Sequence, residues 1–88
     1  MCYKNYMKIT YDENKRLTNI EKHGFDFADL DMEFFASSVV IPSRDGRFKA
    51  IGEFQGVVIV AAVFKPLGSE AISVISMRPA SSKERKLL

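Results

Sequence analysis

The hydrophobic pattern centres on one apolar segment and the alternating segment that follows it. Residues 57–64, VVIVAAVF, form an uninterrupted apolar run, whose β-branched residues and short length predict a strand rather than a helix. Residues 65–70 contain Pro66 and Gly68, which favour a turn. Residues 71–77 alternate between two faces, so the two segments predict a central antiparallel hairpin. Because a continuous apolar strand needs cover on both faces, helices should pack on at least one side of it.

The first part of the chain predicts a strand and a surface helix. Residues 6–11 alternate and indicate a strand, although residues 1–6 are also readable as an N-terminal extension. Asp12 is suited to cap a helix over residues 13–23, which Gly24 would end. The stripe of apolar residues on this helix is narrow, so we expect it to lie on the surface.

The remaining patterns complete an α+β fold. They predict a helix over residues 27–35 capped by Asp26, a strand over residues 38–41, a strand over residues 47–54 and a last helical turn opened by the capping box of residues 81–84. An Asp-Gly pair favours a hairpin between the second and third strands. The predicted order is β-α-α-β-β-β-β-α, an antiparallel sheet with helices packed on one face.

The composition indicates one globular domain over residues 1–88. Apolar residues make up 47% of the chain and charged residues 27%, which are values of ordered proteins. No apolar run approaches the roughly 20 residues that span a bilayer, and the first ten residues are too polar for a signal peptide. Cys2 is the only cysteine, which excludes an intramolecular disulfide and a zinc site with several cysteines. We therefore expect a reduced, cytoplasmic setting without membrane association.

The net charge of +2 hides a separation of charges along the chain. Residues 25–41 contain four acidic and no basic residues, whereas residues 71–88 contain four basic residues and one acidic residue. Residues 1–24 are also basic, with five Lys or Arg against three acids. If the basic ends meet in space they form an anion-binding face, with the acidic middle turned elsewhere. A solvated charge pattern without function explains the separation equally well.

Several familiar catalytic patterns are missing from the sequence. It has no P-loop, no dinucleotide-binding glycine motif and no metal-ligand spacing, and His23 alone cannot anchor zinc. Cations with one histidine remain: Lys15, Lys22, His23, Arg44, Arg47, Arg78 and Arg85. Such a set suits a phosphodiester, because guanidinium groups hold phosphate oxygens and stabilise the charge that develops when a 2′-oxygen attacks. Histidine or lysine then moves the protons.

Each of these residues also has an ordinary structural explanation. His23 stands at the end of a predicted helix, where it would interact with the helix dipole. Arg47 and Arg78 flank strands, where ion pairing is as common as function. Arg85 and Lys86 suit a solvated helix or contact with an RNA backbone. Taken alone, the residues indicate a small RNA-binding or protein-binding domain.

Residues 19–24 read NIEKHG after an aromatic–Asp pair at residues 11–12, and residues 75–80 read ISMRPA ahead of Glu-Arg at residues 84–85. These two motifs resemble those of the BrnT family of toxins. The family pattern is also matched between these motifs by Arg47 and Gly52. The joint presence of the N-x-x-K-H-G and I-S-x-R-x-A motifs, in the family's order, makes the resemblance specific.

The resemblance implies a RelE-like fold of the microbial ribonuclease type and a type II toxin that cleaves RNA and arrests translation. No metal or other cofactor is expected, and the implied partner is a BrnA-type antitoxin in an assembly with two copies of each chain. On this basis the catalytic candidates are Arg47 and Arg78 on the scissile phosphate, with Lys22 or His23 in proton transfer. The candidates for RNA contact are Lys15, Arg44, Arg85 and Lys86.

Two departures from the family pattern leave a rival hypothesis open. Ser73 and Pro79 stand where the family usually has an arginine and a lysine. Losing two cations would weaken phosphate contacts, which are mainly electrostatic. The chain would then be a weak or inactive relative that binds an antitoxin or acts as a co-repressor. A structural domain without any nucleic-acid role is a third hypothesis, which predicts no salt-dependent affinity for RNA.

Overall fold

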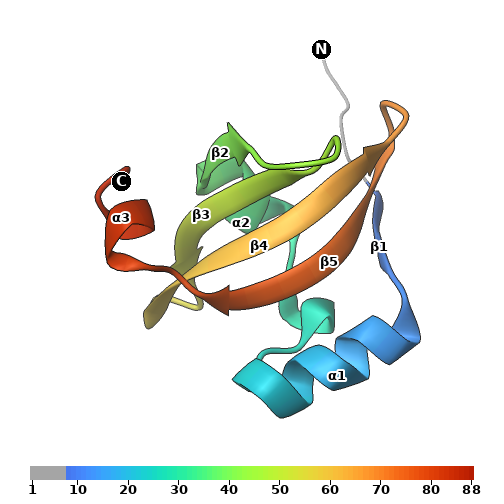
Figure 1. The fold of residues 1–88 in the computed structure, drawn as a ribbon, viewed down its shortest axis with the longest axis horizontal. Coiled ribbons are helices and arrows are strands. Elements are labelled where there is room, and N and C mark those ends of the chain that lie inside the picture. Colours follow the sequence, from blue (N-terminus) through green and yellow to red (C-terminus); the bar gives the residue numbers. More distant parts are fainter. Residues whose placement is uncertain (1–7) are drawn as a thin grey trace.

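The computed structural model describes residues 8–88 and has a mixed α+β fold, as predicted (Figure 1). Its elements are β1 (Lys8–Tyr11), α1 (Glu13–His23), the 3-10 helix η1 (Phe27–Asp29), α2 (Met32–Ser37), β2 (Val39–Pro42), β3 (Phe48–Phe54), β4 (Val58–Leu67), β5 (Ala71–Pro79) and α3 (Ser82–Arg85). The suggested extension at residues 1–6, which includes Cys2, lies outside the described residues. Within residues 8–88, no helix has the length and apolar character needed to cross a membrane.

The five strands form one sheet in the order β1-β5-β4-β3-β2. Strands β2 to β5 make the predicted antiparallel meander, but β1 pairs with β5 in parallel, from Lys8 beside Ala71 to Tyr11 beside Val74. The prediction of a wholly antiparallel sheet is therefore wrong. Alternation within a short strand shows which residues share a face, but it contains no information about the direction of the partner.

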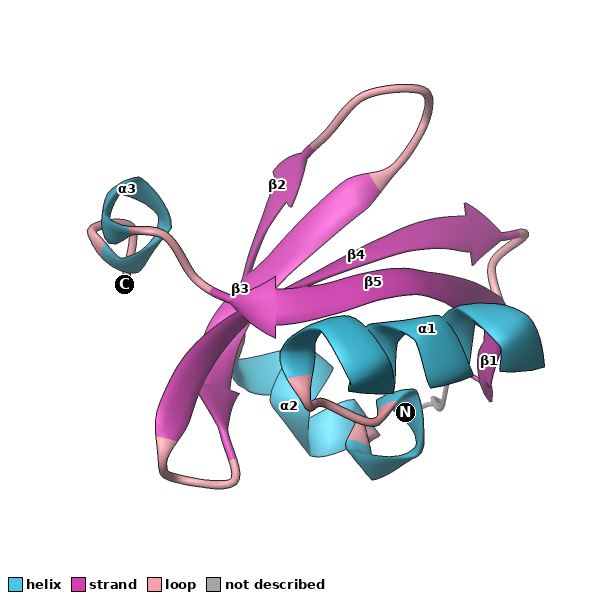
Figure 2. Cartoon of the chain, turned by 60° about the horizontal axis from the view of Figure 1, so that its bottom comes forward, coloured by secondary structure: helices cyan, strands magenta, loops and turns pink. Residues whose placement is uncertain are grey.

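Helix α2 and the 3-10 helix η1 cover one face of the sheet, which we call the helix face, while α1 lies along the β5 edge (Figures 1 and 2). Phe27 and Phe34 pack there against strand residues such as Val60, Val74 and Met77. A smaller cluster of Ile51, Ala61 and Ala80 lies on the opposite face, which we call the open face. Helix α3 contacts the open face through the side chain of Glu84, so the prediction that all helices pack on one face is wrong for α3.

The predicted helix over residues 27–35 is divided into two pieces. Leu30 is extended, with φ −77° and ψ 140°, and the carboxylate of Asp31 then accepts a hydrogen bond of 2.9 Å from the backbone N–H of Phe34. Asp31 thus begins a new helix as its N-cap, because aspartate side chains compete for backbone donors. The apolar positions of the segment still reach the core, and Phe27 is fully buried.

Gly52, one of the residues that match the BrnT pattern, allows α2 to approach β3 closely. A Cβ at this position would lie 3.1 Å from the Cβ of Ser38 and 3.5 Å from Cε1 of Phe34. Because the first distance is shorter than ordinary van der Waals contact, a side chain here would push the end of α2 away from the sheet. The motif glycine therefore serves packing.

Helix α1 has the predicted bounds and caps, and its buried Asn19 joins it to β5. Asp12 accepts a bond from the N–H of Lys15, and Gly24 ends the helix with φ +78°. The Oδ1 of Asn19 accepts from the N–H of Met77 at 3.0 Å, and its Nδ2 donates to the carbonyl of Met77 at 2.9 Å. Strand β1 pairs with the first part of β5, and at Met77, farther along β5, the side chain of Asn19 makes the backbone hydrogen bonds that a neighbouring strand would make. The asparagine of the N-x-x-K-H-G motif is thus a structural residue.

We expect Asn19→Ala to lower the free energy of unfolding by about 2–4 kcal/mol, because it leaves the buried N–H and carbonyl of Met77 without partners. Urea unfolding followed by circular dichroism measures the effect. Asn14→Ala is the matched control: Asn14 is exposed on the same helix, so its removal should change stability by less than about 0.5 kcal/mol. Equal urea midpoints for the two variants would contradict the assignment.

Candidate functional site

A buried carboxylate surrounded by donors lies at the end of β5. Glu84 of α3 is 6% exposed. Its Oε1 and Oε2 accept bonds of 2.8 Å each from Nη1 and Nη2 of Arg78, and Oε2 also accepts a bond of 2.7 Å from Nζ of Lys49. The backbone N–H of Ser81 donates the fourth bond, at 2.8 Å, to Oε1. We call Lys49, Arg78 and Glu84 the Glu84 cluster; two cations around one carboxylate give it a net charge of +1.

Local sequence signals place Glu84 at this point. The predicted capping box is present, since Oγ of Ser81 accepts from the N–H of Glu84 while the Glu84 carboxylate accepts from the N–H of Ser81. The preceding residue, Ala80, is buried and donates its N–H to the carbonyl of Ile59 at 2.9 Å. These bonds fix the start of α3 against the sheet, so that its first turn directs Glu84 toward β3 and β5.

Strand register brings the two cations to the same face. Arg78 pairs with Ala61, and Ala61 pairs with Ile51. Ile51 and Ala61 both belong to the cluster on the open face. Lys49 lies two residues before Ile51 on β3, and successive side chains of a strand alternate between faces. Lys49 and Arg78 therefore both project from the open face, from the two strands β3 and β5 that flank β4.

The charges of the cluster stabilise one another. The hydrogen bonds from Arg78, with smaller contributions from Lys49 and Ser81, hold the pKa of Glu84 well below its ordinary value of 4.5. In turn, the hydrogen bond to Glu84 raises the pKa of Arg78. A general base works best with a pKa near the working pH, so Glu84 is unsuited to accept a proton. Its place in the site is to hold the two cations.

The motif residues Lys22 and His23 lie near this end of the sheet. Both are exposed on the last turn of α1, one turn beyond Asn19. Asn19 is bonded to Met77, the residue before Arg78, and both views place the C-terminal end of α1 beside the end of β5 (Figures 1 and 2). The fold therefore brings the two motifs, more than 50 residues apart in sequence, to one region.

Arg44 and Arg47 lie farther away, in the hairpin between β2 and β3. The N–H of Arg47 donates to the carbonyl of Arg44 at 3.1 Å. Arg47 is four residues before Ile51, the β3 position level with Arg78, and this corresponds to about 13 Å along the strands. The structure therefore does not bring Arg47 and Arg78 together. Lys49 lies between them.

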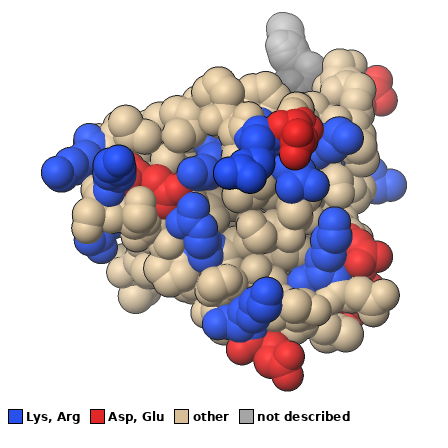
Figure 3. Space-filling model, in the orientation of Figure 1, with Lys and Arg blue, Asp and Glu red and all other residues tan. Residues whose placement is uncertain are grey.

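Basic side chains spread widely over the open face and its margins. Figure 3, seen from the side on which the sheet lies in front of α2, shows several separate groups of Lys and Arg among uncharged residues, with acidic side chains next to some of these groups. The RNA-contact candidates Lys15, Arg85 and Lys86 are all exposed, the first near the start of α1 and the others at α3. Arg16 is different, because its guanidinium binds the carboxylate of Asp26 through bonds of 2.7 and 2.9 Å.

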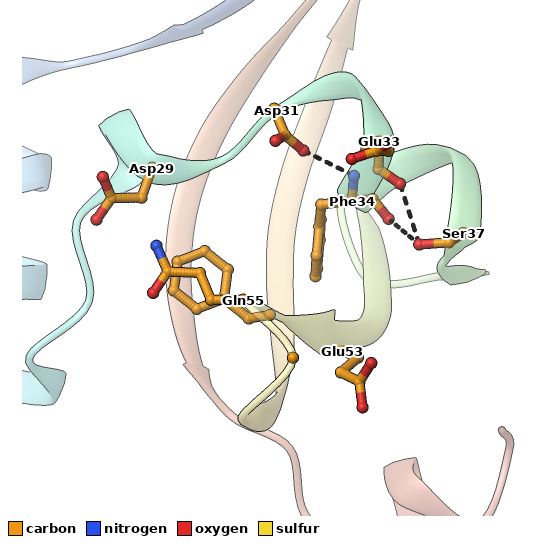
Figure 4. A pocket seen from close by; sticks show the side chains of 9 residues that line it. Asp29, Asp31, Glu33, Phe34, Ser37, Glu53 and Gln55 are labelled. Carbon is orange, nitrogen blue, oxygen red and sulfur yellow. Dashed lines mark hydrogen bonds between the residues drawn. The ribbon is translucent and has the colours of Figure 1, made fainter.

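The acidic middle of the chain surrounds a separate pocket of about 330 Å³. Asp29, Asp31, Glu33 and Glu53 line it together with Phe34 and Gln55 (Figure 4). Its negative charge is opposite to that required for binding a phosphate. Residues 8–88 contain no group of three or more His, Cys, Asp or Glu side chains arranged to hold a metal ion.

The sequence did not single out Lys49, and it placed Glu84 in the capping box and in the Glu-Arg pair of the family pattern without a role in the site. The alternation of β3 was a usable signal, because it places Lys49 on the same face as Ile51. The sequence did not show that Glu84, 35 residues farther along the chain, lies next to Lys49 in space.

Comparison with known proteins agrees with the motifs. A family model described as the ribonuclease toxin BrnT of type II toxin–antitoxin systems matches residues 11–84. The crystal structure of the Brucella abortus ribonuclease toxin BrnT is 62% identical in sequence, with a TM-score of 0.82, over 88% of this chain and 100% of that chain. A search of curated protein sequences found no match. The resemblance inferred from the sequence is confirmed, and the chain belongs to the BrnT family of ribonuclease toxins of type II toxin–antitoxin systems.

Proposed function

We propose that RNA binds along the open face and is cleaved beside Arg78, in a reaction that needs no metal ion. The observation that supports this proposal is the Glu84 cluster, in which two cations share one buried carboxylate and retain a net positive charge. Arg78 is held in one orientation by the two bonds to Glu84, while 34% of its side chain is exposed. A preorganised and accessible guanidinium is suited to stabilise charge on a phosphate.

The proposed reaction is an attack within the RNA itself. The 2′-oxygen of a ribose forms a bond to the adjacent phosphorus, and the bond from phosphorus to the 5′-oxygen of the next nucleotide breaks. Negative charge accumulates on the non-bridging oxygens, where Arg78 donates hydrogen bonds. One group removes the proton of the 2′-hydroxyl and another protonates the departing 5′-oxygen. Lys22 or His23 is our candidate for proton transfer, because both are exposed at the end of α1 beside the end of β5.

The remaining basic residues suit contacts along the RNA strand. Arg47 is separated from Arg78 along the sheet, so we assign it to a neighbouring phosphate rather than to the scissile one. Backbone contacts of this kind set the register of the strand without reading its sequence. We assign the same role to Lys15, Arg44, Arg85 and Lys86, which are exposed.

Membership of a type II toxin family implies an antitoxin partner and an RNA target. We propose that the antitoxin is of the BrnA type, that the assembly contains two copies of each chain, and that it covers the basic open face. We also propose that the chain acts as a single domain in the cytoplasm, with a RelE-like fold. The mixed sheet with η1 and α2 on one face and α1 along its β5 edge supports that fold assignment.

The purified chain, incubated with a long unstructured RNA, tests this function. We expect cleavage in the presence of EDTA, with products ending in 2′,3′-cyclic phosphate, because the 2′-oxygen is the nucleophile and the charge is balanced by arginine. Chromatography and mass spectrometry of the products identify the ends. Cleavage that stops in EDTA and returns with added Mg²⁺ would contradict the metal-independent reaction.

A second candidate function is antitoxin binding without cleavage, and one observation favours it. Ser73, where the family usually has arginine, pairs with Lys65 and belongs by alternation to the open face. Pro79 pairs instead with Val60, which packs on the helix face, so a lysine at that position would not project from the open face. Only one of the two departures therefore removes a cation from the proposed RNA surface. Normal growth on expression of soluble, folded chain would favour this second function.

A further inference from the structure

We infer that Lys49 is a second phosphate-binding residue of the ribonuclease site, held beside Arg78 by the carboxylate of Glu84. The inference deepens the proposed function and rests on its placement of RNA on the open face. Neither the family motifs nor the spacing of basic residues in the sequence points to Lys49. The argument comes from the geometry of the Glu84 cluster.

The shared carboxylate brings the two cationic groups within reach of one ligand. Nζ of Lys49 and Nη2 of Arg78 both bind Oε2 of Glu84, at 2.7 and 2.8 Å. The sum of these distances limits the separation between the two nitrogens to 5.5 Å. One phosphate group has several oxygen acceptors, so two donors this close are able to bind the same phosphate.

Donor hydrogens remain after the bonds within the protein are made. An ammonium group has three N–H hydrogens and a guanidinium has five. Lys49 uses one of them on Glu84, and Arg78 uses two on Glu84 and one on the carbonyl of Pro79. Both cations therefore retain hydrogens for a ligand. Glu84 accepts four bonds and therefore turns its oxygens toward the protein, while its negative charge is already counted in the net charge of +1 of the cluster.

Exposure and charge favour a phosphodiester as this ligand. The side chains of Lys49 and Arg78 are 22% and 34% exposed, whereas that of Glu84 is 8% exposed. The cations thus border the surface while the carboxylate lies beneath it. The single negative charge of a phosphodiester matches the net charge of +1 of the cluster. Along the chain direction of β3, Lys49 also lies between Arg47, in the hairpin before the strand, and the level of Arg78, so that it would join their contacts into one track.

The test measures RNA binding and cleavage by Lys49→Ala over a range of salt concentrations. Loss of a charged hydrogen bond should lower kcat/KM by about 10- to 100-fold. Loss of one phosphate contact should also reduce the slope of log affinity against log salt by about 0.7. Lys49→Arg, which keeps the charge, should recover part of the activity. Because Arg78 keeps both bonds to Glu84 in Lys49→Ala, we expect the variant to fold, and Lys49→Gln provides a longer side chain if it does not.

Lys83→Ala is the matched control, since Lys83 is an exposed lysine of α3 outside the cluster. We expect it to change kcat/KM by less than about threefold, as for a single exposed charge. If Lys49 has only a structural role, Lys49→Ala should lower the unfolding midpoint but show the same salt slope as Lys83→Ala. That result would overturn the inference.

Results that refute the proposed function can be distinguished from results that refute the role of Lys49. Wild type that binds RNA without cleaving it would refute the cleavage proposal, and the salt slopes would still decide the role of Lys49. Wild type that cleaves RNA, together with Lys49→Ala that behaves like Lys83→Ala, would refute the inference alone. Wild type that neither binds nor cleaves RNA would refute both.

Discussion

Arg78→Ala is expected to lower the rate of RNA cleavage by about 100- to 1,000-fold, the typical cost of removing one preorganised donor to a developing oxyanion. The variant removes the guanidinium that Glu84 holds at the open face, and it reduces the net charge of the cluster from +1 to zero. Single-turnover cleavage of a labelled RNA measures the effect directly. Growth after induced expression should change in parallel, with arrest by wild type and normal growth with the variant.

Arg78→Lys separates the effect of charge from that of geometry. A lysine keeps the positive charge but lacks the planar pair of donors that now binds both oxygens of Glu84. We expect intermediate activity from it. Arg78→Ala should remain folded, because Glu84 keeps its bonds from Lys49 and Ser81; the far-UV circular dichroism spectrum checks this. Cleavage by folded Arg78→Ala at the wild-type rate would remove Arg78 from the site.

Glu84→Gln is expected to lower the free energy of unfolding at pH 7 by roughly 2–4 kcal/mol. The substitution keeps the shape of the side chain but leaves the positive charges of Lys49 and Arg78 next to each other without a counter-charge. Urea unfolding at pH 7 measures the difference from wild type. Glu21→Gln is the matched control, because Glu21 is exposed on α1 and its loss should change stability by less than about 0.5 kcal/mol.

The same variant has a defined dependence on pH. Arg78, Lys49 and the N–H of Ser81 hold the pKa of Glu84 below its ordinary value of 4.5, so folding favours the ionised form. The stabilisation is therefore complete above about pH 4.5 and is lost as the pH falls toward the lower pKa of the folded state. The difference in stability between wild type and Glu84→Gln should shrink between pH 5 and pH 3. A difference that stays constant over this range would show that it does not come from the charge of Glu84.

Features that depend on neighbouring residues were predictable from the sequence. The bounds of α1, its caps at Asp12 and Gly24, and the capping box that begins α3 all occur as predicted. Each rests on contacts across three or four residues, which composition and spacing reveal. The exception was the helix expected over residues 27–35, where Asp31 competes successfully for the N–H of Phe34 and divides the segment. This competition is also between neighbouring residues, but helix propensity alone does not tell whether the helix continues or is interrupted by a new cap.

Assembly of the candidate site depended on tertiary structure. Family motifs in the sequence named Lys22, His23 and Arg78, and the fold brings these residues to one end of the sheet. The motifs did not separate Arg47 from this group, nor did they include Lys49. Both outcomes follow from strand register, which fixes how far along β3 each residue lies from Arg78.

By itself, the sequence determined the α+β class, the family, the bounds of α1 and the start of α3, because these follow from periodicity, caps and motifs. The turn predicted for residues 65–70 is wrong in its first half, since β4 continues through Pro66 to Leu67 and pairs with β5 there. Only the tertiary structure decided that β1 runs parallel to β5 and that Asn19 bonds to Met77, 58 residues away. It also decided that Glu84 binds Lys49 across 35 residues. Such pairings depend on the packing of the whole sheet and its helices. Burial of apolar side chains fixes how these elements are arranged, and the arrangement determines which polar groups are close enough to form hydrogen bonds.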